Sequence, residues 1–228
     1  MPIRRKPSKS SRKPRSVLSR PEKKAVRKIA KDTTLRLAET INKVTVVENT
    51  QLFHNKPLYV TALLACEQGT SDDNTQSSKK VRKGDKLALK NMNIHFWLSN
   101  KDDRPNVMYK GVLFWYKSDT AVGDTVVYFT QTNKILDRYN TEQIRVVDQF
   151  IVKSTNNYAV DANNHEKSYL ATLNKSYKAK SIVYDENGTT PKGWDLGFAL
   201  VAYDAFGTLQ TDNIASCAFN VKMSFKDL

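Results

Sequence analysis

Beyond a short N-terminal part, apolar residues recur along the chain with the two-residue period of β-strands. Every second residue from Cys217 to Phe225 is apolar, and the residues between them are small or polar. Because successive side chains of a strand point to opposite faces, this segment is predicted to bury one face only. Between Leu87 and Phe96 the apolar positions change phase near Asn91, which predicts a β-bulge at that point.

Segments rich in Val, Ile, Thr, Tyr and Phe alternate with clusters of Gly, Asn, Asp and Pro, which is typical of strands and their turns. The candidate strands are Leu58–Cys66, Lys86–Leu98, Val107–Tyr116, Thr125–Thr130, Gln143–Lys153, Lys167–Leu173, Lys178–Tyr184, Asp195–Tyr203 and Ile214–Phe225, with a short edge strand at Val44–Val47. No helix interrupts them apart from a turn near Asn133–Tyr139, so the predicted fold class is all-β with antiparallel sheets. A sandwich, a jelly roll or a barrel would close such sheets. Long polar loops favour a single jelly roll of about eight strands over a tight meander.

Charge divides the chain into two parts. The net charge is +14, and residues 1–31 hold thirteen Lys and Arg against one acid, Glu22. The rest of the chain holds 24 Lys and Arg against 22 acids, so it is nearly neutral. A basic tail binds polyanions by releasing their counterions and needs no fixed geometry. The predicted nucleic-acid-binding residues are therefore Arg4, Arg5, Lys6, Lys9, Arg12, Lys13, Arg15, Arg20, Lys23, Lys24, Arg27, Lys28 and Lys31.

The basic part itself has two predicted segments. Residues 2–16 mix cations with three prolines and four serines and are expected to be disordered when free. Ser19-Arg20-Pro21-Glu22 matches a capping box, and apolar residues follow it at helical spacing. We therefore expect an arm over residues 1–40, with a short amphipathic helix at about 19–38, followed by a β-domain over residues 41–228.

Three interpretations of the basic arm compete. It can bind nucleic acid, bind an anionic membrane surface, or act as a nuclear import signal, for which RRKPSKSSRKPR is suitable. The membrane interpretation is the weaker one, because residues 1–31 contain no Trp, Phe or Tyr. No run of 18 apolar residues exists, so no membrane insertion is expected. The N-terminus has no apolar stretch typical of a secretory signal.

Motifs of enzymes are missing from the sequence. The eight glycines form neither GxxxxGK nor GxGxxG, and there is no GxSxG turn. His54, His95 and His165 have no spacing typical of metal ligands or of a catalytic base. We therefore predict that the chain is not an enzyme and uses no cofactor. Cys66 and Cys217 are too few for a disulfide framework and are expected to be buried and reduced.

Three pairs of carboxylates lie in predicted loops: Asp72-Asp73, Asp102-Asp103 and Asp185-Glu186. None follows the EF-hand pattern. Solvated loop charge is the simpler interpretation, and a calcium ion at a contact between subunits is left open.

Several motifs occur in an order that is informative as a set. They are Ala62–Thr70 (ALLACEQGT), Arg82–Leu89 (RKGDKLAL), Met108–Tyr116 (MYKGVLFWY), Gln143–Phe150 (QIRVVDQF) and the ending Phe225-Lys226-Asp227. In this order they resemble the small jelly-roll capsid proteins of circular Rep-encoding single-stranded DNA (CRESS) viruses. They are similar also to the coat proteins of plant satellite viruses. The basic arm with a short helix fits the same resemblance.

The resemblance implies a viral jelly roll with a structural function. Copies of the chain would self-assemble into a T=1 icosahedral shell of about 60 subunits, with the arms inside. Arms of +12 each would supply roughly 720 positive charges, enough to offset much of the charge of a single-stranded genome of about one to two kilobases. The implied partners are other copies of the chain, single-stranded nucleic acid with DNA favoured over RNA, and host import factors. The implied locations are the virion and, during assembly, the host nucleus.

Two other functions compete with this one. The first is a single-stranded nucleic-acid-binding β-barrel, in which aromatic residues such as Phe114-Trp115-Tyr116 and Tyr128-Phe129 would stack on bases. The near-neutral body gives such a site little electrostatic attraction, and the aromatic residues are more simply interpreted as core. The second is an enzyme of the double-sheet cupin type, which needs His and carboxylates clustered on strands.

Overall fold

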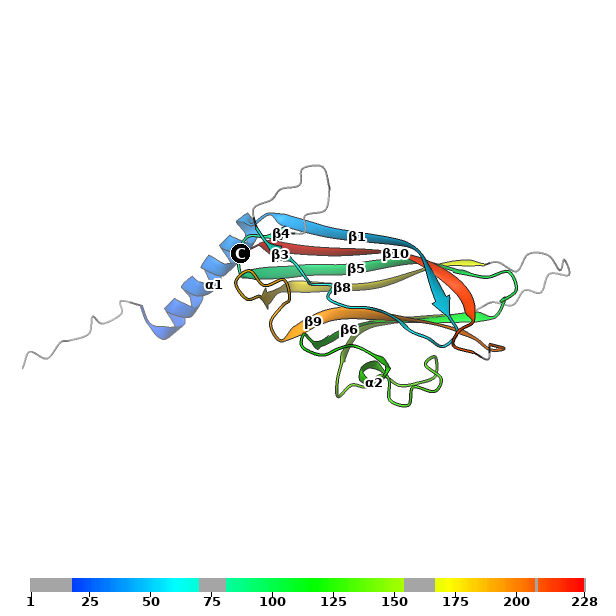
Figure 1. Ribbon diagram of the computed structural model, residues 1–228. Helices are drawn as coiled ribbons and strands as arrows, with labels where there is room; N and C mark the ends of the chain where they lie inside the picture. Colours follow the sequence, from blue (N-terminus) through cyan, green and yellow to red (C-terminus); the bar gives the residue numbers. More distant parts are fainter. Residues whose placement is uncertain (1–17, 70–80, 154–166, 208, 228) are drawn as a thin grey trace, which may run out of the picture. The chain divides into compact units, whose positions relative to one another are not determined.

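The computed structural model describes residues 18–69, 81–153, 167–207 and 209–227 of the chain (Figure 1). Two compact units share these residues, and the division falls between Leu37 and Ala38. The described part of the first unit contains the helix α1 (Arg20–Leu37).

The second unit is built almost entirely from strands. In chain order its elements are β1 (Thr40–Phe53), β2 (Leu58–Val60), β3 (Glu67–Gln68), β4 (Val81–Arg82), β5 (Lys86–Asn100), β6 (Val107–Lys117), α2 (Asp124–Val127), β7 (Arg145–Val152), β8 (Ser168–Val183), β9 (Trp194–Asp204) and β10 (Asn213–Asp227).

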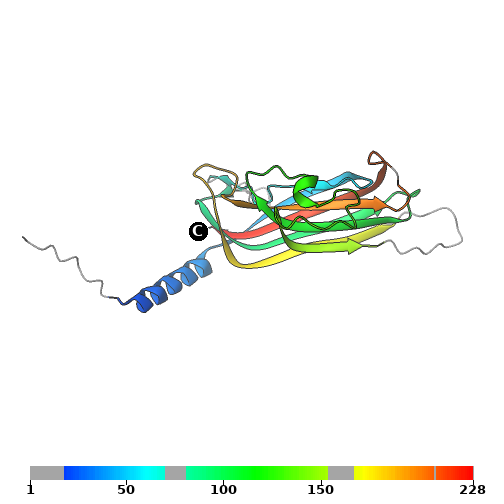
Figure 2. The same cartoon turned by 90° about the horizontal axis from the view of Figure 1, so that it is seen from below.

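Eight of these strands form two four-stranded sheets that face each other (Figures 1 and 2). Sheet A has the order β1-β10-β5-β8, and sheet B has the order β2-β9-β6-β7. The antiparallel partners are β1 with β10, β2 with β9, β5 with β8, and β6 with β7. The first strand therefore pairs with the last, the second with the second last, and so on, until β6 pairs with β7 in the middle of the chain. This is the double-sheet arrangement of a jelly roll, so the predicted all-β jelly-roll fold is confirmed.

The two sheets differ in how they meet solvent. Buried and more exposed positions alternate along most of β10, as expected for a strand with one buried face. In β6 and β9, nearly every residue is buried. The cause is the segment 118–144, which contains α2 and packs on the outer face of sheet B (Figure 1). Sheet B is thus covered on both faces and sheet A on one.

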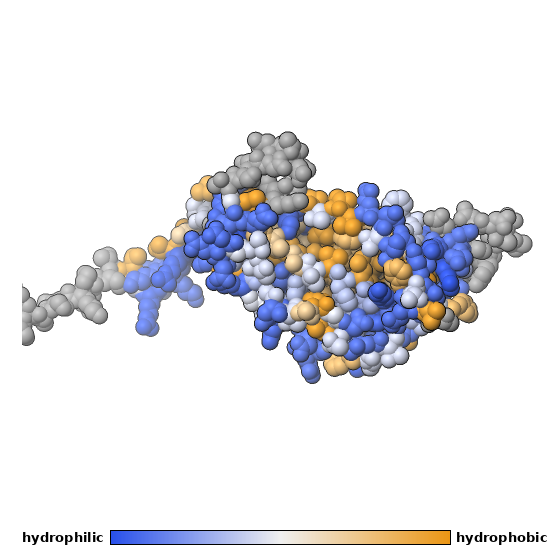
Figure 3. Space-filling view, in the orientation of Figure 1, coloured by the Kyte–Doolittle hydropathy of each residue, from blue (hydrophilic) through white to orange (hydrophobic). Residues whose placement is uncertain are grey.

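The main core lies between the sheets and is rich in aromatic contacts. Phe96, Phe198 and Phe219 meet with ring centroids 5.2–6.2 Å apart. The predicted alternation from Cys217 to Phe225 is confirmed, because all five apolar residues of that set are buried. Figure 3 shows hydrophobic residues gathered along the middle of one edge of the sandwich and polar residues toward both ends.

The β-bulge predicted near Asn91 is confirmed. The registers of β5 with both β8 and β10 shift between Leu89 and Asn91. Lys90 is the extra residue in the pairing with β10, whereas in the pairing with β8 it lies opposite the three residues 177–179. Because of the inserted residue, the core-facing positions change from odd residue numbers before the bulge to even numbers after it, while the apolar side chains stay on the core face.

Other predicted strand limits need correction. The segment Thr125–Thr130 is not a strand: α2 and a single bridge at Tyr128 occupy it. Its β-branched and aromatic residues bury Val127 and Tyr128 against sheet B as part of a covering loop, so tertiary packing overrides strand propensity. The predicted strand Leu58–Cys66 is reduced to Leu58–Val60.

Two further limits were wrong. The predicted strands at 167–173 and 178–184 form the single long strand β8, which bends where Ala179 has a φ of +57°. The predicted short edge strand at 44–47 is part of the 14-residue β1, whose whole length is fixed by pairing with β10. Polar residues at the exposed positions of these strands hide their length in the sequence pattern. The predicted turn near Asn133–Tyr139 is present at residues 134–136.

Candidate nucleic-acid interface

Helix α1 begins at the capping box that the sequence predicts. The Ser19 amide donates to the Glu22 carboxylate at 2.7 Å, and the Glu22 amide faces the Ser19 hydroxyl at 3.5 Å. These hydrogen bonds lower the pKa of Glu22, so the carboxylate stays ionised at the positive end of the helix dipole. In the part of the chain that the structure describes, no helix has the length and apolar character to cross a membrane.

Cations and apolar residues occupy different sides of α1. Six predicted nucleic-acid-binding residues lie on this helix: Arg20, Lys23, Lys24, Arg27, Lys28 and Lys31. At 100° per residue they fall within an arc of about 140°, over a length of about 16 Å. Val26, Ile29 and Leu37 fall on the remaining surface and are exposed, and no residue of α1 is buried. The helix thus presents a continuous basic stripe that polyanions can approach. The other seven predicted residues, Arg4 to Arg15, lie outside the described residues.

Two lysines of the body are unavailable to nucleic acid because they are buried. Lys110 Nζ donates at 2.7–3.1 Å to three backbone carbonyls of the segment 134–137. Burial lowers the pKa of Lys110. Lys134 Nζ donates to the Asn55 carbonyl and pairs with Asp124, both at 3.0 Å. Lys110 fastens the covering loop to sheet B, and Lys134 fastens it to the turn after β1. The sequence pattern did not indicate these roles.

The motif Arg82–Asp85, which carries part of the capsid resemblance, has a structural role. The Arg82 side chain is fully buried and donates to the carbonyls of Asp185 and Gly188 at 3.0 and 2.7 Å. It also donates to the Gly84 carbonyl, and its guanidinium carbon lies 4.5 Å from the Tyr184 ring centroid. One arginine therefore ties together two loops that are a hundred residues apart in sequence.

Residues of other motifs join the same cluster. The Asp227 carboxylate accepts the amides of Lys83 and Gly84 at 2.5 and 3.3 Å. The Gln68 side chain accepts the Asn187 amide at 2.7 Å and donates to the Lys83 carbonyl at 3.2 Å. The motifs that are scattered along the sequence thus meet at one end of the sandwich and hold each other in place.

Aromatic residues divide between core and surface. Phe114, Trp115 and Tyr116 are 0–6% exposed, so they do not form an open stacking face. Trp97, by contrast, is 58% exposed on the outer face of sheet A, where Leu170 on β8 is its directly paired neighbour. Trp97 does not stand out in the sequence, because its place in an alternating strand gives no sign of which face is covered.

The histidines do not form a common site. His54 is buried, accepts the Asp204 amide at Nδ1 (3.3 Å) and packs 4.6 Å from the Tyr203 ring; burial lowers its pKa. His95 is exposed on sheet A, with Nδ1 3.2 Å from the Thr172 hydroxyl. His165 lies outside the described residues. Among the residues described, no group of three or more His, Cys, Asp or Glu is placed to hold a metal ion.

The predicted carboxylate pairs are also separate. Asp72-Asp73 lies outside the described residues. Asp103 lies 3.7 Å from Arg104, and Asp185 pairs with Lys192 at 2.5 Å. One carboxylate of each described pair, Asp103 and Asp185, thus lies beside a cation in a loop.

Three ionisable groups are buried in the main core. Asp195 accepts the amides of Leu64 and Leu196 at 3.1 and 2.6 Å, yet burial raises its pKa to about 6. Cys66 and Cys217 are buried and unlinked, as predicted. Burial raises the pKa of the two thiols to about 11 and about 12, so neither is a reactive thiolate at neutral pH.

Comparison with known proteins gives only distant similarity. No protein-family model and no curated protein sequence matches the chain. A solved structure of Desmodium yellow mottle tymovirus is 9% identical, covers 83% of this chain and 88% of that one, and has a TM-score of 0.35. A solved structure of turnip yellow mosaic virus is 8% identical, covers 83% of this chain and 94% of that one, and has a TM-score of 0.36. The cryo-EM structure of broad bean stain virus is 8% identical, covers 84% of this chain and 91% of that one, and has a TM-score of 0.31. Function is therefore argued from the chain's own residues.

Proposed function

We propose that the chain is the capsid protein of a small virus, and that its basic arm binds the packaged genome. The observation that carries this proposal is the separation of charge from fold. Residues 1–31 hold +12 of the net charge of +14, whereas the jelly roll that follows is almost neutral. A neutral β-sandwich can pack against copies of itself without repulsion, and a flexible cationic segment can follow a polyanion of any sequence.

Exposed apolar surface on the body supports self-association. Between β1 and β2, at the open edge of the sandwich, a groove of about 270 Å³ is lined by residues that include Val47, Val60 and Phe219. Leu136 and Leu170, elsewhere on the body, are 79% and 85% exposed. Such surface is costly in a protein that stays monomeric and is typical of contact regions. Heterologous contacts of this kind close into a shell when they repeat around several symmetry axes.

The finer statements of the proposal follow the resemblance to CRESS virus capsid proteins. We propose a T=1 shell of about 60 subunits, a single-stranded genome with DNA favoured over RNA, and assembly in the host nucleus after recognition of the arm by import factors. The arm would lie inside the shell, where its thirteen cations neutralise phosphates without reading bases.

The alternative, a monomeric β-barrel that binds single strands on an aromatic face, has less support. Its stacking residues would be Phe114, Trp115 and Tyr116, and all three are buried. The cations that such a face needs lie mainly in the arm.

Purified full-length protein tests the proposal directly. Size-exclusion chromatography and negative-stain microscopy should reveal closed particles of uniform size that protect nucleic acid from added nuclease. Trypsin should cleave the arm in particles disrupted by high salt but not in intact ones. Monomers or dimers under all solution conditions would exclude the shell, and an arm cleaved equally in intact particles would exclude its place inside.

A further inference from the structure

A pocket on the body combines cations with tryptophans. It has a volume of about 230 Å³ and lies between the edge strand of each sheet, β7 and β8. Its lining includes Trp115 on β6, Arg145 on β7, Lys180 on β8 and Trp194 on β9. Lys192 completes a set of three cations, and the lining contains no acidic residue.

Both edge-strand cations occupy positions that normally hold core residues. Arg145 is directly paired with Trp115, whose side chain belongs to the main core. Lys180 is directly paired with Leu89, which is fully buried. Because paired residues project on the same side of a sheet, Arg145 and Lys180 point into the gap between the sheets. The register alone therefore brings two positive charges from different sheets to one opening.

The tryptophans hold these cations in place. The Arg145 guanidinium carbon lies 4.3 Å from the Trp194 ring centroid, and Lys180 Nζ lies 4.0 Å from the Trp115 ring centroid. Each cation thus rests on an aromatic face, which fixes its position and leaves its N–H groups available as donors.

Two of the three cations of the pocket, Arg145 and Lys180, have no carboxylate partner in the described structure, whereas Lys192 pairs with Asp185. Among the described residues, no carboxylate lies within 4.0 Å of the Arg145 or Lys180 cationic nitrogens. The pKa of Lys180 is lowered, first by burial and then by the charge of Arg145. An anion between the two cations would remove this repulsion.

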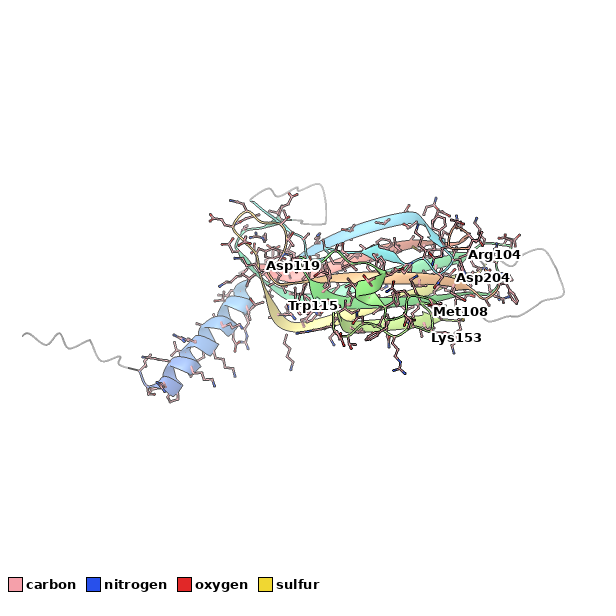
Figure 4. The ribbon with its side chains drawn as sticks, turned by 60° about the horizontal axis from the view of Figure 1, so that its bottom comes forward. Arg104, Met108, Trp115, Asp119, Lys153 and Asp204 are labelled. Carbon is pink, nitrogen blue, oxygen red and sulfur yellow. The ribbon has the colours of Figure 1, made fainter. Side chains whose placement is uncertain are left out.

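The pocket also lies near the point where the arm joins the body. Ser181, which lines the pocket, shares a row of paired residues with Thr40, the first residue of β1. The two residues are three strands apart, which is about 14 Å. Trp115 lies toward the end of the sandwich opposite to Arg104 and Asp204 (Figure 4). The pocket therefore lies at the same end of sheet A as Thr40, which follows the arm in the chain.

We propose that the pocket formed by Trp115, Arg145, Lys180 and Trp194 binds a backbone phosphate of the single-stranded nucleic acid that the arm holds. This inference rests on the proposed function, because it names a second contact for the same cargo. The guanidinium of Arg145 and the ammonium of Lys180 donate to the phosphate oxygens, and the small volume admits one phosphate group rather than a duplex. The arm supplies attraction, and the pocket fixes one point of the strand on the rigid body.

Two measurements on the full-length chain test the proposal with an oligothymidylate of about 20 nucleotides as the probe. In the first, ultraviolet cross-linking followed by mass spectrometry should place cross-links on the peptides that contain Trp115 and Trp194. In the second, the slope of log K against log salt should fall by about 0.7 in the variant Arg145→Gln/Lys180→Gln, because the one phosphate contact of the pocket is lost.

Control variants separate binding from folding. Arg138→Gln/Lys175→Gln removes the same charge from exposed body positions outside the pocket and should leave cross-links and slope unchanged. Arg145→Lys/Lys180→Arg keeps the charge and should retain the slope, which keeps the test decisive if the neutral variant fails to fold. An unchanged slope with a lowered melting temperature in the neutral variant would show that the two cations only cap the core.

The outcomes also separate this inference from the proposed function. Particles that protect nucleic acid, with cross-links confined to residues 1–37, would overturn the pocket and leave the capsid proposal intact. Cross-links at Trp115 and Trp194 without particles would support the pocket and overturn the shell. If the neutral variant loses affinity for a sulfated oligosaccharide but not for oligothymidylate, the assignment to nucleic acid is wrong.

Discussion

At the scale of single residues, the buried cation Arg82 joins three backbone carbonyls of two loops. Its guanidinium donates to the carbonyls of Gly84, Asp185 and Gly188, and removing it would leave these carbonyls without this charged donor. We predict that Arg82→Met, which nearly keeps the volume, lowers the free energy of unfolding by about 3–5 kcal/mol. Urea denaturation, followed by tryptophan fluorescence, measures the free energy of unfolding of each variant. The exposed Arg138→Met should change stability by less than about 0.5 kcal/mol, and equal losses in both variants would contradict the role of Arg82.

Asp195 gives a prediction about pH. Its pKa is raised from 3.8 to about 6 in the folded chain, mainly by burial, despite two amide hydrogen bonds and the charge of Lys43. The folded state therefore holds this proton more tightly than the unfolded state does. Its contribution to stability is complete below the unfolded pKa and is lost as pH rises from about 4 to about 6, by up to about 3 kcal/mol.

The variant Asp195→Asn isolates this contribution. The Asn oxygen can still accept the amides of Leu64 and Leu196, but the side chain no longer titrates. The difference in unfolding free energy between the variant and the wild type should therefore grow in favour of Asn between about pH 4 and pH 6 and then level off. Asp119→Asn, at an exposed position, serves as the control. Parallel pH profiles for wild type and Asp195→Asn would refute the prediction.

The sequence predicts some residue roles and hides others for a physical reason. The role proposed for the thirteen cations of the arm rests on the sequence alone, because a polyelectrolyte interaction depends only on charge density along the chain. The roles of Arg82 and Lys110 depend on carbonyls brought in by folding, 103 and 24 residues away. Arg145 and Lys180 lie on different sheets, so their meeting depends on register. The pocket therefore could not be predicted without the structure.

At the scale of elements, α1 depends on its cap, because no residue of the helix is buried. We predict that Ser19→Ala destabilises the first turn by about 1 kcal/mol and speeds amide exchange there about fivefold. Hydrogen exchange of the full chain, read by mass spectrometry on the peptide that covers α1, provides the measurement. Ser19→Asp should keep the wild-type rate, since its carboxylate also accepts the amide. Equal acceleration in both variants would exclude the capping role.

The bulge in β5 and the helix α2 show which elements the pattern of apolar residues can predict. The bulge at Lys90 was predictable because a strand that keeps one face on the core changes its apolar phase only where a residue is inserted or skipped. The helix α2 was not, because Thr125–Thr130 has the composition of a strand. Its backbone makes local hydrogen bonds, such as the Tyr128 amide to the Asp124 carbonyl at 2.8 Å, and its side chains pack on the face of sheet B.

At the scale of the whole molecule, the jelly-roll pairing explains why distant motifs act together. Pairing the first long strand with the last places Thr40 opposite Lys226, so the arm joins the body beside the C-terminal end of β10. The cluster of Arg82, Gln68 and Asp227 and the cation pocket lie toward that same end of sheet A. The fold thus gathers the first residue of β1, the motif cluster and the pocket at one end of sheet A, although their residues lie far apart in the sequence.

If the arm neutralises the genome inside a shell, its charge sets how much nucleic acid a particle holds. Replacing the seven cations from Arg4 to Arg15 by Gln leaves α1 intact and lowers the charge of each arm from +12 to +5. We predict that the phosphorus-to-protein ratio of purified, nuclease-treated particles falls by roughly half. Exchanging Lys and Arg at the same seven positions keeps the charge and should keep the ratio, since phosphate neutralisation does not depend on the identity of the cation. An unchanged ratio in the Gln variant, or a comparable fall in the exchange variant, would contradict control of packaging by charge.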